Sequence, residues 1–346
     1  MNLWSRRLCL TASIILVLIL NACGNSSTTT GSGGSSGPIS LRIMVGGLNK
    51  QIYLPNELTQ RLGYFTQEGL NVTLIDEASG QSAEDEVLAG QVDAGSGSYN
   101  HTIELQAAGK QMECVVQLDI APGEAEMVSA KEASTITSAK DLSGKNLGVT
   151  ELGSGTQTLT TLILHKVGVA PSQVHFIPVG AGDTFIAAMQ QGKIDAGMTT
   201  EPTISRLISS GVGKVLVDLR TPQATQAALG GPYPFICVFM RNDYVSSHQA
   251  VVQKLVNAYV KTLKWIHTHT AEQIADMMPP DYYAGNKALY VQALQNQLAI
   301  FSPDGAMPDG GPQFVLTAEQ ETNTTVQGKQ INLSATYTNQ FVNNAS

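Results

Sequence analysis

Charged residues are scarce in this sequence, and those present are not arranged to bind nucleic acid. They make up 14% of the 346 residues, and the formal net charge is −8. No run of lysine or arginine follows the first few residues. Because phosphate binding needs a basic face, nucleic acid is not an expected partner. The hydrophobic share of 42% can supply buried cores, and the length allows two domains.

Motifs that hold metals, nucleotides or nucleophiles are also missing. The sequence has no CxxC pair, no HExxH and no GxGxxG, and no GxSxG lies in the predicted folded body. His267 and His269 stand two positions apart on a predicted helix, so they point to different faces. Cys114 and Cys237 lie in apolar strands and are interpreted as packing residues, although whether they pair is open. We therefore expect no metal, no cofactor and no catalytic residue.

The N-terminus has the pattern of a bacterial lipoprotein. Two arginines precede the apolar stretch 8–20, which is too short to span a membrane comfortably and is typical of a secretory signal. The ending Leu-Asn-Ala-Cys resembles a lipobox, which predicts a signal peptide over 1–22 and lipidation of Cys23. An ordinary signal peptide is the alternative. Residues 23–38 are a Gly/Ser/Thr tether. The expected location is the extracytoplasmic face of a membrane, in a periplasm or at the cell exterior.

One motif occurs twice, as GQVDAGSGSYN from Gly90 and GKIDAGMTTEP from Gly192. Each copy follows a helical pattern, and each glycine suits the left-handed position that ends a helix. Each copy predicts a short buried strand, over 92–94 and 194–196, followed by an open loop. Open α/β sheets bind ligands at the carboxyl ends of their strands. The two loops are therefore candidate ligand-binding segments.

The segments around both copies share one order of strands and helices, which predicts two similar α/β lobes with a ligand cleft between them. Each lobe is expected to be a mixed sheet flanked by helices. The apolar strand that follows residue 234 cannot extend the completed second repeat, so the chain is expected to return to the first lobe. This places lobe 1 at 39–125 and 233–346 and lobe 2 at 126–232. Hinge crossings are expected near 121–129 and 230–237.

Candidate ligand contacts come from the loops and helix starts that face this cleft. Free N–H groups at a helix start can hold an acidic or carbonyl group, which draws attention to 153–156. Plain helix capping is the alternative there and at Asp183, and a solvated loop lysine is the alternative at Lys50. The full candidate set is Asn49, Lys50, Gln51, Gly80, Gln81, Ser96, Ser98, Tyr99, Gly153, Ser154, Gly155, Thr156, Asp183, Thr200, Glu201 and Tyr233.

The cleft loops hold more carboxylates than cations, and this balance predicts the ligand's chemistry. Asp183 and Glu201, with Glu151 as a further candidate, face only Lys50 among the cations. A buried carboxylate needs a cation or donors, so a small organic molecule with N–H or cationic groups is expected. A flat nitrogen heterocycle stacked on a tyrosine fits this balance. A zwitterion with its acidic end at 153–156 is the nearest rival.

The stretch GYFTQEGLNVTLI, the paired motifs, the GSGT loop and the TTEPT stretch appear in the order found in one protein family. The chain resembles the solute-binding proteins of ABC importers, in the nitrate, taurine, alkanesulfonate and thiamine-precursor branch. The resemblance implies a periplasmic-binding-protein fold, a two-stranded hinge, closure on a small molecule, and an ABC permease and its ATPase as partners. It also implies a monomer without enzymatic activity. A ligand-presenting sensor and a pyrimidine-precursor synthase-like enzyme are the alternatives.

Overall fold

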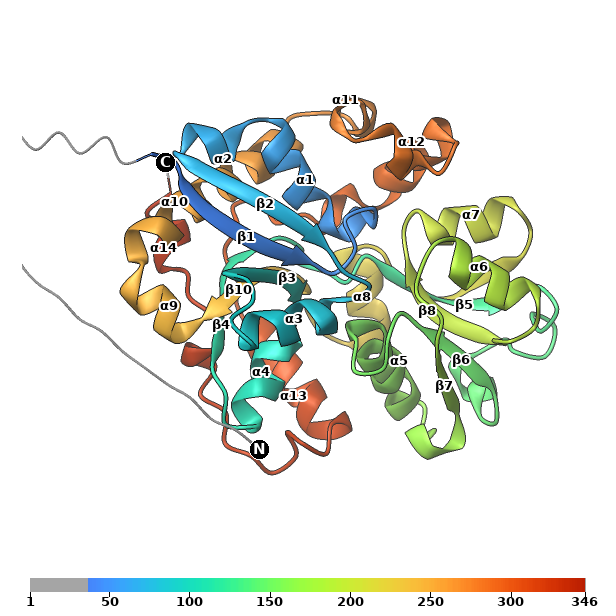
Figure 1. Cartoon of the computed structure of the whole chain (residues 1–346). Coiled ribbons are helices and arrows are strands. Elements are labelled where there is room, and N and C mark those ends of the chain that lie inside the picture. The colour runs from blue at the N-terminus through green and yellow to red at the C-terminus, as the bar shows by residue number, and fades with distance from the viewer. Residues whose placement is uncertain (1–36, 346) are drawn as a thin grey trace, which may run out of the picture. The chain divides into compact units, whose positions relative to one another are not determined.

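Two five-stranded mixed sheets organise residues 37–345, the part of the chain that this computed structural model describes (Figure 1). The first sheet forms lobe 1 and has the order β2-β1-β3-β10-β4. The second forms lobe 2 and has the order β7-β6-β8-β5-β9. The strands are β1 (Ile39–Val45), β2 (Leu70–Asp76), β3 (Ala94–Ser98), β4 (Met112–Gln117), β5 (Glu124–Ser129), β6 (Asn146–Val149), β7 (His175–Pro178), β8 (Ala196–Thr200), β9 (Gly213–Leu219) and β10 (Ile236–Arg241). The predicted α/β class and two-sheet architecture are confirmed.

The two sheets are built alike, and each contains one strand that arrives from the other lobe. In lobe 1, β1 pairs in parallel with β2 and β3, whereas β10 is antiparallel to β3 and β4. In lobe 2, β6 pairs in parallel with β7 and β8, whereas β5 is antiparallel to β8 and β9. β5 begins at Glu124, two residues before the expected boundary of 126.

Two chain segments cross between the lobes, and they lie side by side. The backbone N–H of Leu118 donates to the carbonyl of Ile236 at 2.8 Å, and that of Phe235 donates to Asp119 at 2.9 Å. The crossings therefore form a short hydrogen-bonded pair of extended segments between β4 and β5 and before β10. A pair of this kind can bend through a few backbone torsions while the sheets stay rigid.

Helices cover both faces of each sheet (Figure 1). The C-terminal helices lie mainly over lobe 1, where α10 packs on α1 and α2. Tyr259 of α10 contacts Phe65 of α2 edge-to-face, with ring centroids 5.3 Å apart. The helices are α1 (Leu54–Arg61), α2 (Tyr64–Gln67), α3 (Gly80–Leu88), α4 (Asn100–Ala107), α5 (Gly155–Lys166), α6 (Asp183–Gln190), α7 (Thr203–Ser209), α8 (Pro222–Leu229), α9 (Asn242–Ser247), α10 (Gln249–Ile266), α11 (Ala271–Met277), α12 (Lys287–Gln297), α13 (Gly311–Thr322) and α14 (Gln340–Asn343).

The repeated motif forms strands where the sequence predicted loops. β3 covers AGSGS and β8 covers AGMTT, so each strand begins at the alanine of the motif and continues through the small polar residues. The prediction of strands over 92–94 and 194–196 was wrong by about two residues. Close packing explains the difference, because a Cβ on Gly95 would lie 2.4 Å from the Phe239 ring and one on Gly197 would lie 2.5 Å from the carbonyl of Gly148. The small residues belong to central strands.

The aspartate of each motif ties its strand to the neighbouring parallel strand. Asp93 accepts a hydrogen bond from the backbone N–H of Arg42 at 2.7 Å, and Asp195 accepts one from Asn146 at 2.8 Å. The two aspartates therefore have the same structural role, each in its own lobe. Gly90 and Gly192 have φ of +71° and +70°, as the left-handed helix end requires.

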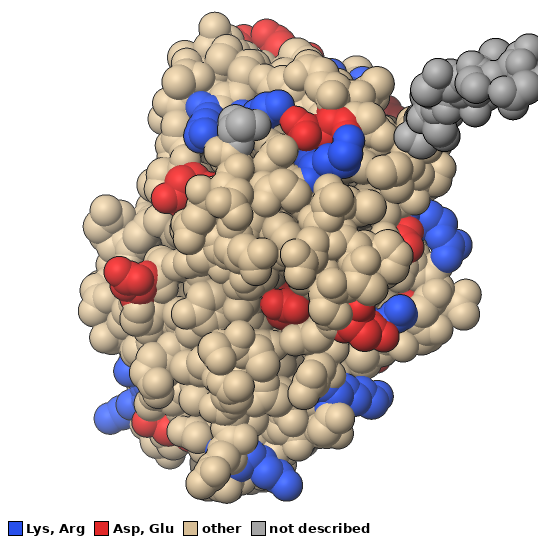
Figure 2. Space-filling view, turned by 90° about the vertical axis from the view of Figure 1, so that its left-hand side faces the viewer, with Lys and Arg blue, Asp and Glu red and all other residues tan. Residues whose placement is uncertain are grey.

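Cys114 and Cys237 are buried and free, in the adjacent strands β4 and β10. No helix within residues 37–345 is both long enough and apolar enough to cross a membrane. The predicted signal peptide and the lipidation of Cys23 lie outside the described residues. On the face shown in Figure 2, charged residues of both signs are scattered singly or in small groups over a largely uncharged surface.

Candidate functional site

A small cavity lies between the lobes, and both lobes line it. The volume that the centre of a water molecule can occupy in it is about 20 Å³, which is room for roughly one water molecule. Lobe 1 and the crossing segment supply charged, hydroxyl and aromatic groups, and lobe 2 supplies a carboxyl group and a row of hydroxyls. The lining residues are Lys50, Ile52, Tyr53, Ser79, Gly80, Ser98, His101, Glu124, Thr150, Ser154, Gly155, Thr156, Thr200 and Phe235.

Lys50 brings a buried ammonium group to this cavity. Its Nζ donates to the carbonyl oxygens of Gly46 at 2.6 Å and Ala78 at 2.7 Å. An ammonium has three donors, so one N–H is left without a protein acceptor among the described residues. Burial lowers the pKa of Lys50 from 10.5 to about 8, although the carboxyl groups of Glu124, Asp76 and Glu151 act to raise it. At neutral pH the side chain of Lys50 is therefore mostly in its charged form.

Two helix N-termini, one from each lobe, meet at the cavity. α3 begins at Gly80, and α5 begins at Gly155. A Cβ on Gly155 would lie 2.7 Å from the Phe235 ring and 2.9 Å from Ser98 Oγ, and one on Gly80 would lie 2.9 Å from the Cα of Gly97. Only glycine lets the backbone approach so closely. The unpaired N–H groups of a helix start carry partial positive charge, so both ends favour an anion.

Glu124 is the carboxyl group of the cavity. It is 3% exposed, and its Oε2 is buried without a hydrogen-bond partner among residues 37–345. Burial raises its pKa well above the ordinary value, while Lys50 acts in the opposite direction. No ion pair joins Glu124 to a cation in the described part of the chain. A buried acceptor left in this state is costly, which makes it the most unusual group of the lining.

His101 reaches the cavity from the start of α4 and is held by a second carboxyl group. Its Nδ1 lies 2.5 Å from Oε2 of Glu84, and both side chains are buried. Burial lowers the pKa of His101, but the Glu84 carboxylate outweighs it, and the net shift is upward. Nε2 has no partner within the described residues, and neither has Oγ1 of Thr200. Both groups are therefore free to bond to a ligand.

Seven of the sequence-predicted residues line this cavity: Lys50, Gly80, Ser98, Ser154, Gly155, Thr156 and Thr200. They belong to the helix starts and strand ends that the repeat pattern had marked. Thr156 Oγ1 accepts from the backbone N–H of Thr150 at 3.0 Å and contacts Ser154 Oγ at 2.6 Å. These bonds tie the start of α5 to the end of β6, whereas Ser154, the residue before α5, makes no side-chain cap to the helix, so the alternative of plain helix capping is not what the structure shows.

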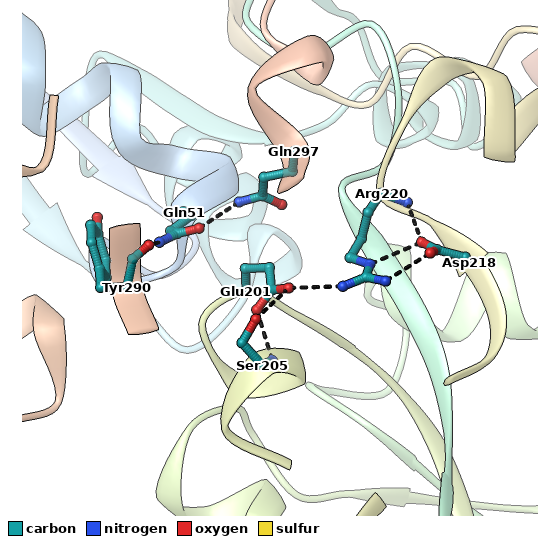
Figure 3. Close-up of polar contacts among 7 residues, drawn as sticks. All are labelled: Gln51, Glu201, Ser205, Asp218, Arg220, Tyr290 and Gln297. Carbon is teal, nitrogen blue, oxygen red and sulfur yellow. Dashed lines mark hydrogen bonds and ion pairs between the residues drawn. The ribbon is translucent and has the colours of Figure 1, made fainter. Parts of the chain in front are cut away.

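Glu201 lies beside the cavity and is fully bonded within its own lobe (Figure 3). Its carboxylate accepts from the backbone N–H of Ser205 at 2.9 Å, from Ser205 Oγ at 3.0 Å and from Arg220 Nη1 at 3.2 Å. Arg220 is itself held by Asp218 at 2.7 Å. These bonds leave Glu201 no free oxygen for a ligand, and we assign it a structural role.

Gln51 also turns away from the cavity. Its Nε2 donates to the carbonyl of Tyr290 at 2.9 Å, and its Oε1 accepts from Gln297 at 2.8 Å (Figure 3). Its backbone N–H donates to the carbonyl of Glu201 at 3.0 Å, so the residue joins lobe 1 to lobe 2 through its main chain. Asn49, two positions before Gln51, is exposed.

The two tyrosines expected to stack on a ligand lie in the protein core. Tyr99 OH bonds to Thr336 Oγ1 at 2.6 Å, and its ring packs edge-to-face on Tyr337. Tyr233 is buried against Phe235 and Phe314. Neither lines the cavity, so the structure does not place them where stacking on its contents is feasible.

The remaining candidates also lie outside the cavity lining. Asp183 is exposed at the start of α6, where it pairs with Arg206. Ser96 is buried and accepts from Asn56 at 3.1 Å. Gln81 of lobe 1 and Gly153 of lobe 2 lie close together outside the lining. A Cβ on Gly153 would lie 3.2 Å from Oε1 of Gln81.

The other seven lining residues were not in the candidate set, namely Ile52, Tyr53, Ser79, His101, Glu124, Thr150 and Phe235. Glu124 and Phe235 fall in the crossing segments, which were treated as hinge. A signal was present, because EAEMVS places two carboxyl groups in an otherwise apolar strand. Carboxyl groups in an apolar strand indicate a binding or pairing role, since burying an unpaired charge is costly.

Direct hydrogen bonds hold the lobes together at the rim. Glu151 of lobe 2 accepts from Ser79 Oγ and, at 2.8 Å, from Ser82 Oγ, both at the start of α3 in lobe 1. With the Gln51–Glu201 main-chain bond, these contacts describe lobes closed over the cavity. Opening would break them and expose the lining.

Comparison with known proteins gives a consistent family and fold. A family model described as NMT1/THI5-like matches residues 55–273, more than half of the chain. A solved protein of Bordetella bronchiseptica is 33% identical with a TM-score of 0.85, over 88% of this chain and 96% of its own. The ligand-binding component of an ABC-type import system from Staphylococcus aureus is 14% identical, with a TM-score of 0.69, over 89% and 99%. The periplasmic aliphatic sulphonate-binding protein SsuA of Escherichia coli is 18% identical, with a TM-score of 0.63, over 88% and 99%.

Proposed function

Because the chain belongs to the NMT1/THI5-like family, we propose that it is an extracytoplasmic solute-binding lipoprotein of an ABC importer. It captures a small organic molecule between its two lobes and delivers it to the permease and its ATPase. It acts as a monomer and catalyses no reaction. Solved proteins that share the fold include a component of an ABC-type import system and a periplasmic binding protein.

One observation carries the proposal. The lobes close over a cavity whose lining holds polar atoms without partners among the described residues, namely Glu124 Oε2, Thr200 Oγ1 and a ring nitrogen of His101. Buried polar groups in folded proteins are nearly always bonded. A solute that bonds to them would repay their desolvation, and it would stabilise the closed arrangement over the open one.

Membrane attachment is the second part of the proposal, and the N-terminal sequence supports it. Lipid on Cys23 would anchor the body, and the Gly/Ser/Thr tether of residues 23–38 would give it reach. A tethered binding protein stays at high local concentration near its permease. The apolar stretch before Cys23 would be removed as a signal peptide.

The direct test is native mass spectrometry of the full chain, extracted from bacterial membranes in mild detergent. We expect one discrete small-molecule adduct that disappears on partial denaturation and rebinds after refolding. A refolded protein that gains no adduct from an extract of its own cells, and whose scattering profile stays unchanged, would contradict the proposal.

A second candidate function is an enzyme on the same fold, which the buried Glu84–His101 pair favours. A histidine oriented by a carboxylate, with its other nitrogen facing a cavity, is the arrangement of a general base. The same experiment separates the two functions. A binding protein returns the adduct with its mass unchanged after prolonged incubation, whereas an enzyme converts it.

A further inference from the structure

A basic and an acidic group face the cavity from opposite lobes without forming an ion pair. Lys50 belongs to lobe 1 and Glu124 begins β5 in lobe 2, and both line the cavity. They are 8% and 3% exposed, yet no ion pair of 4.0 Å or less joins them. Buried opposite charges usually pair directly, because each is costly alone. Here neither group pairs with the other, so both remain available to a ligand.

We propose that the ligand is a small zwitterion, whose acid group lies between the N-termini of α3 and α5 beside Lys50 and whose ammonium group pairs with Glu124. This inference rests on the proposed function, since it names the solute class for the same cavity.

The acid end of the ligand has three sources of positive potential. The N-terminus of α3 comes from lobe 1, that of α5 comes from lobe 2, and Lys50 keeps one N–H free. Thr156 and Ser154 add hydroxyl groups at the start of α5. Since the two helix ends belong to different lobes, an acid group between them draws the lobes together. Binding at this end therefore favours closure.

The ammonium end follows from what the other carboxyl groups are doing. Asp183 is exposed and paired with Arg206, and Glu201 is bonded to Ser205 and Arg220. Glu124 is the carboxyl group of the cavity lining, and its free oxygen has no donor in the described residues. An ammonium group would donate to that oxygen and favour the ionised form of Glu124, which a plain anion would disfavour.

The small cavity favours a ligand with few atoms between its charged ends. The closed lobes leave a cavity volume of only about 20 Å³, so they must separate to admit even a small solute. The apolar side chains of Ile52 and Phe235 offer a surface for two or three methylene groups. Tyr99 and Tyr233 offer no stacking surface, because both lie in the core, and the aromatic rings of the lining are those of Tyr53 and Phe235.

Titration calorimetry with matched probes tests the inference on the full chain in detergent. The zwitterions are 3-aminopropanesulfonate and β-alanine, the amine-free acids are propanesulfonate and propionate, and the acid-free probe is propylamine. We expect the zwitterions to bind at least about 10-fold more tightly than their amine-free acids, as a charge-assisted hydrogen bond predicts. Propylamine should bind most weakly.

Two variants and a control assign the contacts. Glu124→Gln should weaken zwitterion binding about 10- to 100-fold and leave the amine-free acids within about 3-fold. Lys50→Met should weaken both classes. Glu132→Gln, which removes a carboxylate that pairs with Lys145 on the surface of the same lobe, should change neither. Thermal unfolding of each variant checks that it is folded.

Proton release gives an independent readout. Burial holds the Glu124 pKa well above its usual range, and a bound ammonium would lower it again, whereas a bound acid group would raise the pKa values of Lys50 and His101 on the same cavity. Zwitterion binding should therefore release more protons than binding of the matched amine-free acid. Calorimetry in two buffers of different ionisation enthalpy measures this. The inference is overturned by acids that bind as tightly as zwitterions, by an unaffected Glu124→Gln variant, or by a failure of every probe. The proposed function would survive each of these results, provided that native mass spectrometry still shows a bound solute.

Discussion

The guanidinium of Arg220 and the carboxylate of Glu201 form an ion pair of 3.2 Å inside lobe 2, next to the ligand cavity and outside its lining. Glu201 is completely buried and Arg220 is 15% exposed. Ser205 supplies two further hydrogen bonds to the same carboxylate. The pair thus fixes the turn between β8 and α7, directly after Thr200, the last residue of β8, which lines the cavity. The Glu201–Arg220 pair therefore contributes to ligand binding indirectly, by fixing the position of Thr200.

Glu201→Gln should lower stability more than it lowers ligand affinity. A glutamine amide has a single oxygen acceptor, so Arg220 or Ser205 loses a hydrogen-bond partner, at a cost of about 1–3 kcal/mol in the free energy of unfolding. Urea unfolding measures the stability, and calorimetry with the native ligand measures the affinity. A variant of unchanged stability that binds more than about 10-fold more weakly would restore Glu201 to the ligand contacts.

Glu151 should act as a latch on the closed state. It accepts from Ser79 and Ser82 across the mouth of the cleft and does not line the cavity. Glu151→Ala removes both bonds only in the closed arrangement, so the equilibrium shifts toward the open one. We expect about 10-fold weaker apparent affinity, as loss of one or two hydrogen bonds to a charged acceptor predicts.

Small-angle scattering checks the latch. The wild type should show a smaller radius of gyration with its ligand than without it, and the Glu151→Ala variant should need more ligand to reach the same radius. Glu132→Ala serves as the control, because the side chain of Glu132 bonds to Lys145 and Thr135 of its own lobe. An identical ligand dependence in the wild type and both variants would rule out the latch.

Cys23→Ser should release the protein from membranes. The variant loses the only thiol at the end of the apolar stretch, so it cannot receive lipid there. Cell fractionation and immunoblotting should move the protein from the membrane pellet to the soluble fraction, with ligand binding unchanged. A variant that stays in the pellet and carries no lipid by mass spectrometry would show that another anchor operates.

The repeat pattern was sufficient to predict the fold, because it depends on local periodicity that occurs twice. The strand and helix order of both lobes follows from apolar runs, glycine helix ends and the duplicated Asp-Ala-Gly motif. Asp93 and Asp195 show why the motif recurs, since each bonds the neighbouring parallel strand in its own sheet. A local motif with a local purpose is visible in sequence.

The site was harder to predict, because its side chains are chosen by contacts between distant residues. Tyr99 follows Ser98 directly, yet Ser98 lines the cavity while Tyr99 reaches Thr336 in the core. Gln51 is satisfied by Tyr290, which is 239 positions away. Glu124 lies in a crossing segment, where no repeat exists to mark it. Direction of a side chain at a strand end depends on tertiary packing, which periodicity does not encode.

The last prediction concerns Lys50 and pH. Burial lowers its pKa from 10.5 to about 8, so between these two values the unfolded chain holds a proton that the folded protein has released. Stability rises with pH wherever the unfolded state binds more protons, by at most about 1.4 kcal/mol per pH unit for one group. The charged ammonium therefore opposes folding below pH 8, and the penalty is relieved as the pH increases toward 10.5.

Lys50→Met isolates this contribution. The variant also loses the bonds to Gly46 and Ala78, but that loss is a constant offset, whereas the protonation term depends on pH. We therefore expect the stability of the wild type minus that of the variant to increase between pH 7.5 and 9.5, measured by urea unfolding at fixed ionic strength. A difference that stays flat across this interval, or falls, would mean that Lys50 titrates as an exposed lysine and is not held inside the cavity.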